Sequence, residues 1–151
     1  MRIKKSYTEN INPIEEMYFY EITIERKEDI IDGDTIDVNI DVGFGITIRE
    51  RIRIFGIDTP ELKTEEGQKA KEIARRILWE DITLNRYFIR TYKKSLKDQE
   101  GLKAFANEVK KGKYGRYLGE IFVLTKTGKV WNYNQTLIEN GLAKGYFGGK
   151  K

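Results

Sequence analysis

Two acidic residues flank a proline in the stretch RIFGIDTPE, which covers residues 53–61 and follows a strand-like pattern. Asp58 and Glu61 lie three residues apart, and Pro60 between them restricts the backbone. Carboxylate oxygens bind hard cations such as Ca²⁺, and a carboxylate can also orient or deprotonate a water molecule. The stretch is therefore a candidate for metal-assisted hydrolysis, although the same residues are also typical of a helix N-terminus.

Three further segments carry groups suited to the same chemistry. DGDT at 32–35 supplies two more carboxylates, Arg53 precedes the DTPE turn at 58–61, and KYGR at 113–116 ends in a second arginine. Taken singly, each has a plainer interpretation, because Asp-Gly-Asp usually marks only a turn and a basic turn is common in hairpins. Their combination favours a single functional site.

Hydrolysis of a phosphodiester needs an activated water, neutralised phosphate oxygens and stabilisation of the charge that builds on phosphorus. We predict that Asp34 and Asp58, with the carbonyl of Thr59, hold one Ca²⁺ against the phosphate. Glu61 is predicted to orient or deprotonate the attacking water, with Pro60 fixing its angle to the metal ligand. Two arginines can clamp the phosphate with paired donors.

The composition removes several competing chemistries. The chain of 151 residues contains no cysteine and no histidine. Disulfide scaffolds, zinc fingers, Ser-His-Asp triads and cysteine proteases are therefore excluded. A metal in this protein must be held by carboxylates, carbonyls and water, which suits Ca²⁺, Mg²⁺ or Mn²⁺.

The charges are unevenly distributed along the chain. Residues 1–90 hold 15 basic and 19 acidic residues, whereas residues 91–151 hold 13 basic and 5 acidic residues. A basic C-terminal half favours a polyanionic partner such as nucleic acid, although a well-solvated surface has the same composition.

The periodicity of the sequence predicts a domain of mixed structure. Alternating apolar residues predict strands over 17–25, 35–40, 46–55, 82–92 and 117–124. Helical spacing predicts helices after Pro60, near 102–109 and near 132–140, the last ending at Gly141. We therefore expect an α+β, mainly β, domain: either a five-stranded Greek-key barrel of OB type with two to three helices, or another small α+β fold.

The segment 46–55 makes the most specific prediction about side-chain orientation. Its isoleucines, Ile46, Ile48, Ile52 and Ile54, are expected on one face, and Thr47, Arg49, Arg51 and Arg53 on the other. Periodicity alone thus places Arg53 on the solvent side of its strand.

At this point the ordered motifs can be compared with known families. These are DGDT at 32–35, R-x-x-x-x-D-T-P-E at 53–61, a helix, K-Y-G-R at 113–116 and N-x-x-L-x-x-x-G-L-A-K at 134–144. In the order of these motifs the chain resembles the staphylococcal nuclease (thermonuclease) family. The resemblance runs from about residue 17 to 146. It implies an OB-fold barrel and a Ca²⁺-dependent nuclease that cuts DNA and RNA with little sequence preference and leaves 3′-phosphate ends.

The resemblance also implies a role for each matching residue. Asp34, Asp58 and the Thr59 carbonyl would ligate Ca²⁺, and Asp32 would act in the outer shell through water. Glu61 would activate or orient water, and Arg53 and Arg116 would clamp the phosphate. Substrate contacts would come from Lys113 and Tyr114, and from Tyr146, whose spacing after G-L-A-K differs from the family pattern.

Several features depart from the family. Gly112 precedes KYGR where an acidic residue is usual, residues 93–111 form an expected insertion, and the hairpin between Asp34 and Arg53 is long. The chain also ends soon after GLAK, where the family has a final helix. None of these departures removes a predicted catalytic residue; they bear on substrate preference and on the packing of the C-terminus. The alternative function is a catalytically silent OB-fold module that binds nucleic acid or protein, because this fold is used both for catalysis and for binding.

We expect one domain over residues 1–151, with a flexible tail at 1–15, that acts as a monomer on single-stranded or locally melted DNA and RNA. No window approaches the length of a membrane span, so no membrane partner is expected. The polar N-terminus predicts no secretory signal and favours an intracellular protein, although a trimmed leader would leave the same sequence.

Overall fold

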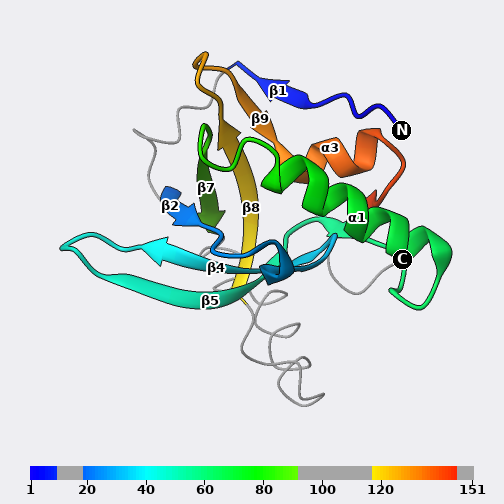
Figure 1. Cartoon of the computed structure of the whole chain (residues 1–151), viewed down its shortest axis with the longest axis horizontal. Helices are drawn as coiled ribbons and strands as arrows, with labels where there is room; N and C mark the ends of the chain where they lie inside the picture. The colour runs from blue at the N-terminus through cyan, green and yellow to red at the C-terminus, as the bar shows by residue number, and fades with distance from the viewer. Residues whose placement is uncertain (10–18, 92–116, 146–151) are drawn as a thin grey trace, which may run out of the picture.

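Five strands close into a barrel in the computed structural model, which describes residues 1–9, 19–91 and 117–145 (Figure 1). The strand order is β8–β5–β4–β2–β7, and β7 pairs back with β8. The barrel strands are β2 (Phe19–Thr23), β4 (Thr35–Asp41), β5 (Thr47–Ile54), β7 (Arg86–Thr91) and β8 (Tyr117–Leu124). The β5–β8 pair is parallel and the other barrel pairs are antiparallel. The predicted OB-type barrel of the α+β class is confirmed.

Shorter elements cover the ends and edges of the barrel. The short strands are β1 (Ser6–Thr8), β3 (Ile30–Asp32), β6 (Ile57–Asp58), β9 (Val130–Asn132) and β10 (Lys144–Gly145). The helices are a 3₁₀ turn, η1 (Lys27–Asp29), and the α-helices α1 (Glu65–Trp79) and α3 (Tyr133–Glu139). None of the helices within the described residues is long and apolar enough to cross a bilayer.

The helix α1 begins and packs as its sequence predicts. The Thr64 hydroxyl accepts a hydrogen bond from the Gly67 backbone N–H, and Glu65 and Glu66 occupy the first turn, where the helix dipole favours acids. The buried face of the helix consists of Gly67, Ala70, Ile73, Ala74, Ile77 and Leu78. This face covers β3 at one end of the barrel.

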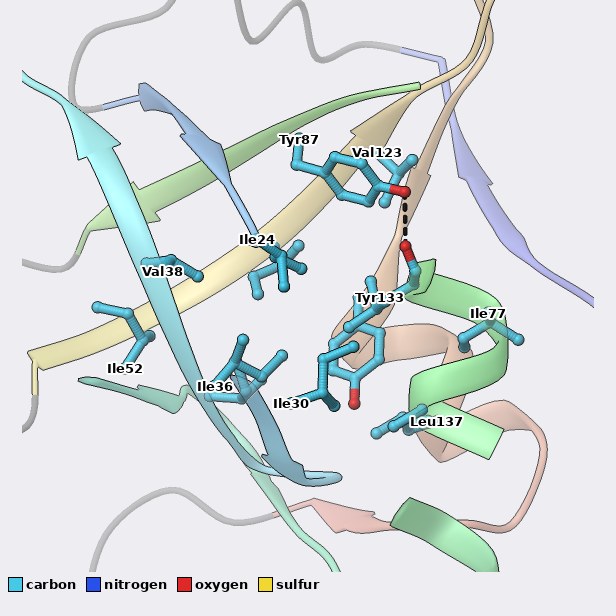
Figure 2. Packing of buried hydrophobic residues seen from close by; sticks show 14 of the residues in the cluster. Ile24, Ile30, Ile36, Val38, Ile52, Ile77, Tyr87, Val123, Tyr133 and Leu137 are labelled. Atoms are coloured by element: carbon cyan, nitrogen blue, oxygen red, sulfur yellow. Dashed lines mark hydrogen bonds between the residues drawn. The ribbon is translucent and has the colours of Figure 1, made fainter. Parts of the chain in front are cut away.

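The core lies inside the barrel and under the two α-helices. Figure 2 shows Ile30 and Ile36 beside the ring of Tyr133, with Leu137 and Ile77 nearby. The hydroxyl of a second buried tyrosine, Tyr87, donates to the Leu78 carbonyl at 2.6 Å. Each side chain of this kind buries apolar area worth about 1.5–3 kcal/mol, so the core holds the barrel and the helices together.

The fourth predicted strand is shorter than its sequence suggests. The prediction for 82–92 is wrong over its first residues, because β7 begins at Arg86. Asp81 adopts a positive φ of 55°, and its carbonyl accepts hydrogen bonds from the backbone N–H groups of Leu84 and Asn85. A tight turn after α1 therefore occupies these positions and exposes the side chain of Leu84.

The N-terminus and the long hairpin also differ from expectation. Residues 6–8 form β1, which pairs with β9, in a segment expected to be a flexible tail. Ile46 and Ile48 are 54% and 42% exposed, although the alternation placed them on the core face. The β4–β5 hairpin projects beyond the barrel (Figure 1), so the outer half of its apolar face meets no core. The helix predicted near 102–109 lies outside the described residues.

Candidate metal and phosphate site

The register of the β4–β5 hairpin places Arg53 beside the first acidic turn. Thr35 pairs with Arg53, so the arginine lies opposite the residue that follows Asp34. The Arg53 guanidinium donates to the Ile54 carbonyl at 3.0 Å, and its side chain is 18% exposed. The assignment of Arg53 to solvent by periodicity is therefore wrong, because the two acidic turns fold over that end of β5.

Arg53 lies between two carboxylates from different parts of the chain. Its guanidinium nitrogens are 3.6 Å from Oδ2 of Asp34 and 3.7 Å from Oδ1 of Asp58. Asp34 comes from the turn between β3 and β4, and Asp58 ends β6. Three segments that are separate in the sequence thus bring two acids and one guanidinium together.

The two acidic turns are joined directly by hydrogen bonds. Oδ2 of Asp34 accepts from the Thr59 backbone N–H at 3.1 Å and from the Thr59 hydroxyl at 3.0 Å. Oδ1 of Asp32 accepts from the Asp34 backbone N–H at 3.0 Å, which closes the DGD turn. Asp34 is therefore fixed in place, with its side chain only 13% exposed.

Gly33 and Tyr133 explain how the turns approach so closely. A Cβ atom on Gly33 would lie 2.6 Å from Cγ2 of Thr59, so a larger residue would push the turns apart. The fully buried Tyr133 hydroxyl donates to the Gly33 carbonyl at 2.7 Å. Burial, and then the charges of Asp34 and Asp32, raise the Tyr133 pKa well above its usual value, so the hydroxyl stays a donor. Tyr133 was not among the predicted site residues, because one aromatic residue at a helix start carries no distinct signal.

Ionisation of both neighbouring carboxyl groups, Asp32 and Asp34, is less favourable than ionisation of one of them. Burial, and then the hydrogen bond and charge of Asp34, raise the pKa of Asp32 to about 6. Burial also acts to raise the pKa of Asp34, but the hydrogen bond to Asp32, the Arg53 charge and the Thr59 donors outweigh it and lower that pKa. A divalent cation would relieve the same repulsion that the shared proton relieves.

Glu61 has a fixed backbone and an exposed side chain that pairs with Lys63. Its carbonyl accepts hydrogen bonds from the Thr64 backbone N–H and from the Thr64 hydroxyl. A Cβ atom on Gly67 would lie only 1.9 Å from this carbonyl, so glycine is required where α1 meets the DTPE turn. The Glu61 carboxylate is 73% exposed, and Nζ of Lys63 lies 3.2 Å from it. Among the ion pairs of the described residues, Glu61 is paired with Lys63 and not with Arg53.

Residues 134–144, which carry the N-x-x-L-x-x-x-G-L-A-K motif, bond to the segments that hold the site. The Asn134 side chain donates to the Phe55 carbonyl and accepts from the Ile121 backbone N–H, joining the end of β5 to β8. Gly141 has a φ of +71° and lets the chain turn after α3. The lysine of the motif, Lys144, pairs with Asp58 in the β10–β6 ladder. The motif thus positions the second acidic turn through its backbone.

Four predicted site residues, Lys113, Tyr114, Arg116 and Tyr146, lie outside the described residues. The described part of the site offers oxygen ligands, one guanidinium and an exposed carboxylate at the end of a rigid turn. Within the ranges that the structure describes, no group of three acidic side chains gathers as a complete cation cage. The described oxygen atoms would therefore supply only some of the ligands of a cation, and the substrate or water would supply the others.

Comparison with known proteins gives two findings. Residues 51–151 match the family described as staphylococcal nuclease homologue. The chain is also 31% identical over 125 residues to an uncharacterized protein of Methanocaldococcus jannaschii. That alignment covers 78% of this chain and 56% of the relative, so the chain spans little more than half of the relative's length.

Proposed function

Because the chain belongs to the staphylococcal nuclease family, we propose that it is a Ca²⁺-dependent nuclease that hydrolyses phosphodiester bonds in DNA and RNA. We propose low sequence specificity and products with 3′-phosphate ends. The observation that carries the proposal is the meeting of Asp34, Arg53 and Asp58, which come from three separate segments. A silent binding module has no need to bring these groups together.

The donors around Asp34 fit a hard cation. Asp34 and Asp58 offer carboxylate oxygens, the Thr59 carbonyl is the third proposed ligand, and Asp32 acts from the outer shell. The mutual repulsion of Asp32 and Asp34, which a proton relieves only below about pH 6 in the metal-free protein, supports a cation between these turns. Bound there, Ca²⁺ would neutralise phosphate oxygens and lower the pKa of nearby water.

The remaining groups act on the substrate and on water. Arg53, held by the Ile54 carbonyl and the two acids, would donate to a phosphate oxygen and stabilise the charge that develops on it. Arg116 would supply the second pair of donors. Glu61 would turn from Lys63 toward the phosphate and orient or deprotonate the attacking water. Lys113, Tyr114 and Tyr146 would contact the nucleic acid beside the cleaved bond.

The direct test is digestion of single-stranded DNA and RNA by the purified chain in Ca²⁺, in Mg²⁺ and in chelator, with analysis of the product ends. We expect cleavage in Ca²⁺ only, with 3′-phosphates on the products. Glu61→Ala should reduce cleavage by at least about a hundredfold with little change in DNA binding. Nucleic acid that is bound but left uncut under every metal would instead establish the silent module.

A further inference from the structure

One edge of the described part of the chain carries a net positive charge. Residues 1–9 and the turn 125–129 contain five basic residues and one acidic residue. All other described residues together contain 13 basic and 18 acidic residues. The edge is therefore positive on a body that is otherwise negative, and it would attract a polyanion.

The tertiary structure brings these two sequence-distant segments together. β1 pairs with β9 through Ser6–Asn132, Tyr7–Trp131 and Thr8–Val130, and the turn 125–129 leads directly into β9. Figure 1 shows β1 and β9 side by side at one edge of the molecule, with α3 below them. The cations of both segments thus share a surface separate from the acidic turns.

An exposed aromatic ring stands among these cations. Tyr7 is 53% exposed, and Nζ of Lys129 lies 5.7 Å from the centre of its ring. Trp131, the partner of Tyr7 in β9, is buried, and Nζ of Lys5 lies 5.1 Å from its ring centre. Because Tyr7 pairs with Trp131, these two side chains point to the same face, and the ring contacts of Lys129 and Lys5 place both lysines on that face as well.

An open hollow adjoins the same edge. It has a volume of about 450 Å³ and is lined by Lys4, Lys5, Ser6, Tyr7, Thr8, Asn132, Gln135 and Glu139. The acid in this lining, Glu139, is engaged by the Ser6 hydroxyl and the Gln135 amide. The hollow is thus polar, with hydroxyls, amides and ammonium groups around one ionised carboxylate. Beside an exposed ring, such a lining suits the polar edge of a nucleobase better than an apolar ligand, with the phosphates placed along the lysines.

We propose that this basic edge, formed by Lys4, Lys5, Tyr7, Lys126 and Lys129, binds a single-stranded segment of nucleic acid outside the cleavage site. This inference rests on the proposed function and adds a second contact with the same substrate class. A single strand is favoured over a duplex because Tyr7 offers a stacking surface, which only an unpaired base can use. The lysines would follow the phosphates on either side.

The test compares the double variant Lys126→Ala/Lys129→Ala with Lys69→Ala/Lys71→Ala, which removes the same charge from α1. Binding of a fluorescent thymidine 30-mer is measured by anisotropy in chelator over a range of salt concentrations. We expect the first variant to raise Kd about tenfold and to reduce the slope of log Kd against log salt by about 1.4, or about 0.7 for each lost phosphate contact. The α1 variant should leave both quantities close to wild type.

Tyr7→Ala separates stacking from charge. It should raise Kd about tenfold with an unchanged salt slope, because a stacked base contributes without releasing counterions. Cleavage of a short substrate that occupies only the cleavage site should proceed at the wild-type rate in all three variants. Wild-type affinity for DNA in both edge variants would overturn the proposal. Poly-glutamate serves as a second probe: if the edge variants lose affinity for poly-glutamate and not for DNA, the edge binds an acidic protein partner instead.

These measurements distinguish a failure of the edge proposal from a failure of the nuclease proposal. If the wild-type chain cuts DNA and the edge variants bind it normally, only the edge proposal fails. If no metal supports cleavage while the edge variants still lose affinity, the catalytic proposal fails and the edge remains a nucleic-acid contact.

Discussion

The two halves of β5 have the same alternating sequence and opposite environments. In the inner half, Ile52 and Ile54 are each 1% exposed and Arg53 between them is 18% exposed. In the outer half, Ile48 is 42% exposed and Arg51 is 51% exposed. The alternation sets which residues share a face, but it does not decide whether that face is covered.

The neighbouring strands account for the difference. Residues 52–54 pair with β8, and on the other side residues 52 and 53 pair with β4 while the Ile54 backbone N–H donates to the Asp34 carbonyl. Residues 47–51 pair with β4 alone among the described strands. The two arginines therefore serve different purposes. Arg51 makes two hydrogen bonds to Asp37, at 2.8 and 3.0 Å, on the hairpin surface, while Arg53 faces Asp34 and Asp58.

The largest expected effect separates these two arginines in activity. Arg53→Ala should lower kcat by about a hundred- to a thousandfold, because it removes a positioned donor to the phosphate. Arg51→Ala, the matched control one alternation away, should change kcat less than about threefold, since Arg51 is half exposed and pairs with Asp37 instead of the two acidic turns. Initial rates on single-stranded DNA in Ca²⁺ provide the measurement. Equal losses in the two variants would mean that the arginine row acts as a general basic surface.

The next effect separates the isoleucines in stability. Ile54→Ala should lower the free energy of unfolding by about 2–5 kcal/mol, because it leaves a cavity in the closed barrel. Ile48→Ala should lower it by less than about 1 kcal/mol, because much of that side chain is already in water. Urea denaturation followed by tryptophan fluorescence measures both values. A large loss from Ile48→Ala would show that the outer half of the hairpin is covered in solution.

A smaller effect concerns the pH dependence of the metal-free protein. Because the pKa of Asp32 is raised to about 6, its protonated form favours folding, and this contribution is lost as pH rises from about 4 to about 6. Asp32→Asn should therefore increase the free energy of unfolding by about 1–2 kcal/mol at pH 7 and leave it nearly unchanged at pH 4.

The control for this pH effect is Asp41→Asn at the outer end of β4, where the side chain is exposed. The measurement is urea denaturation in chelator at both pH values. An Asp32→Asn variant that is less stable than wild type at pH 7 would contradict the repulsion between the Asp32 and Asp34 carboxyl groups.

The smallest effect is expected at the tip of the hairpin. Phe44 is fully exposed and has a positive φ of 57°, between Gly43 and Gly45, which also have positive φ. Because left-handed backbone is costly for a residue with a Cβ, Phe44→Gly should increase the free energy of unfolding by up to about 1 kcal/mol. Thermal denaturation at low protein concentration detects this change. A clear loss of stability would show that the Phe44 ring makes contacts in solution.

Local patterns predicted much of the fold. The alternation in YLGEIFVL identified β8 with its observed bounds, Tyr117–Leu124, and the helical spacing after Pro60 identified α1. Such patterns succeed because a strand or helix with one buried face must repeat its apolar residues at the period of that element. The first residues of the predicted strand 82–92 failed, because a turn with a positive φ at Asp81 leaves no periodic signal.

The candidate site was predictable in its chemistry and only partly in its geometry. Without histidine or cysteine, a metal site would have to use oxygen ligands, and the sequence picked out Asp34, Arg53 and Asp58, which the structure brings together. The burial of Arg53 and the support from Tyr133 were not predictable, because both depend on contacts between segments far apart in the chain.

The sequence by itself determined most of the barrel strands and the helix that follows the DTPE turn, because these follow from local periodicity. Its ordered motifs gave the resemblance to the family, and its lack of histidine and cysteine restricts any metal site to oxygen ligands. The tertiary structure decided which half of β5 is covered, which arginine faces the acids, and that β1 and β9 join two basic segments into one edge. Burial and electrostatic environment depend on what packs against a residue, and that neighbour is usually distant in the chain.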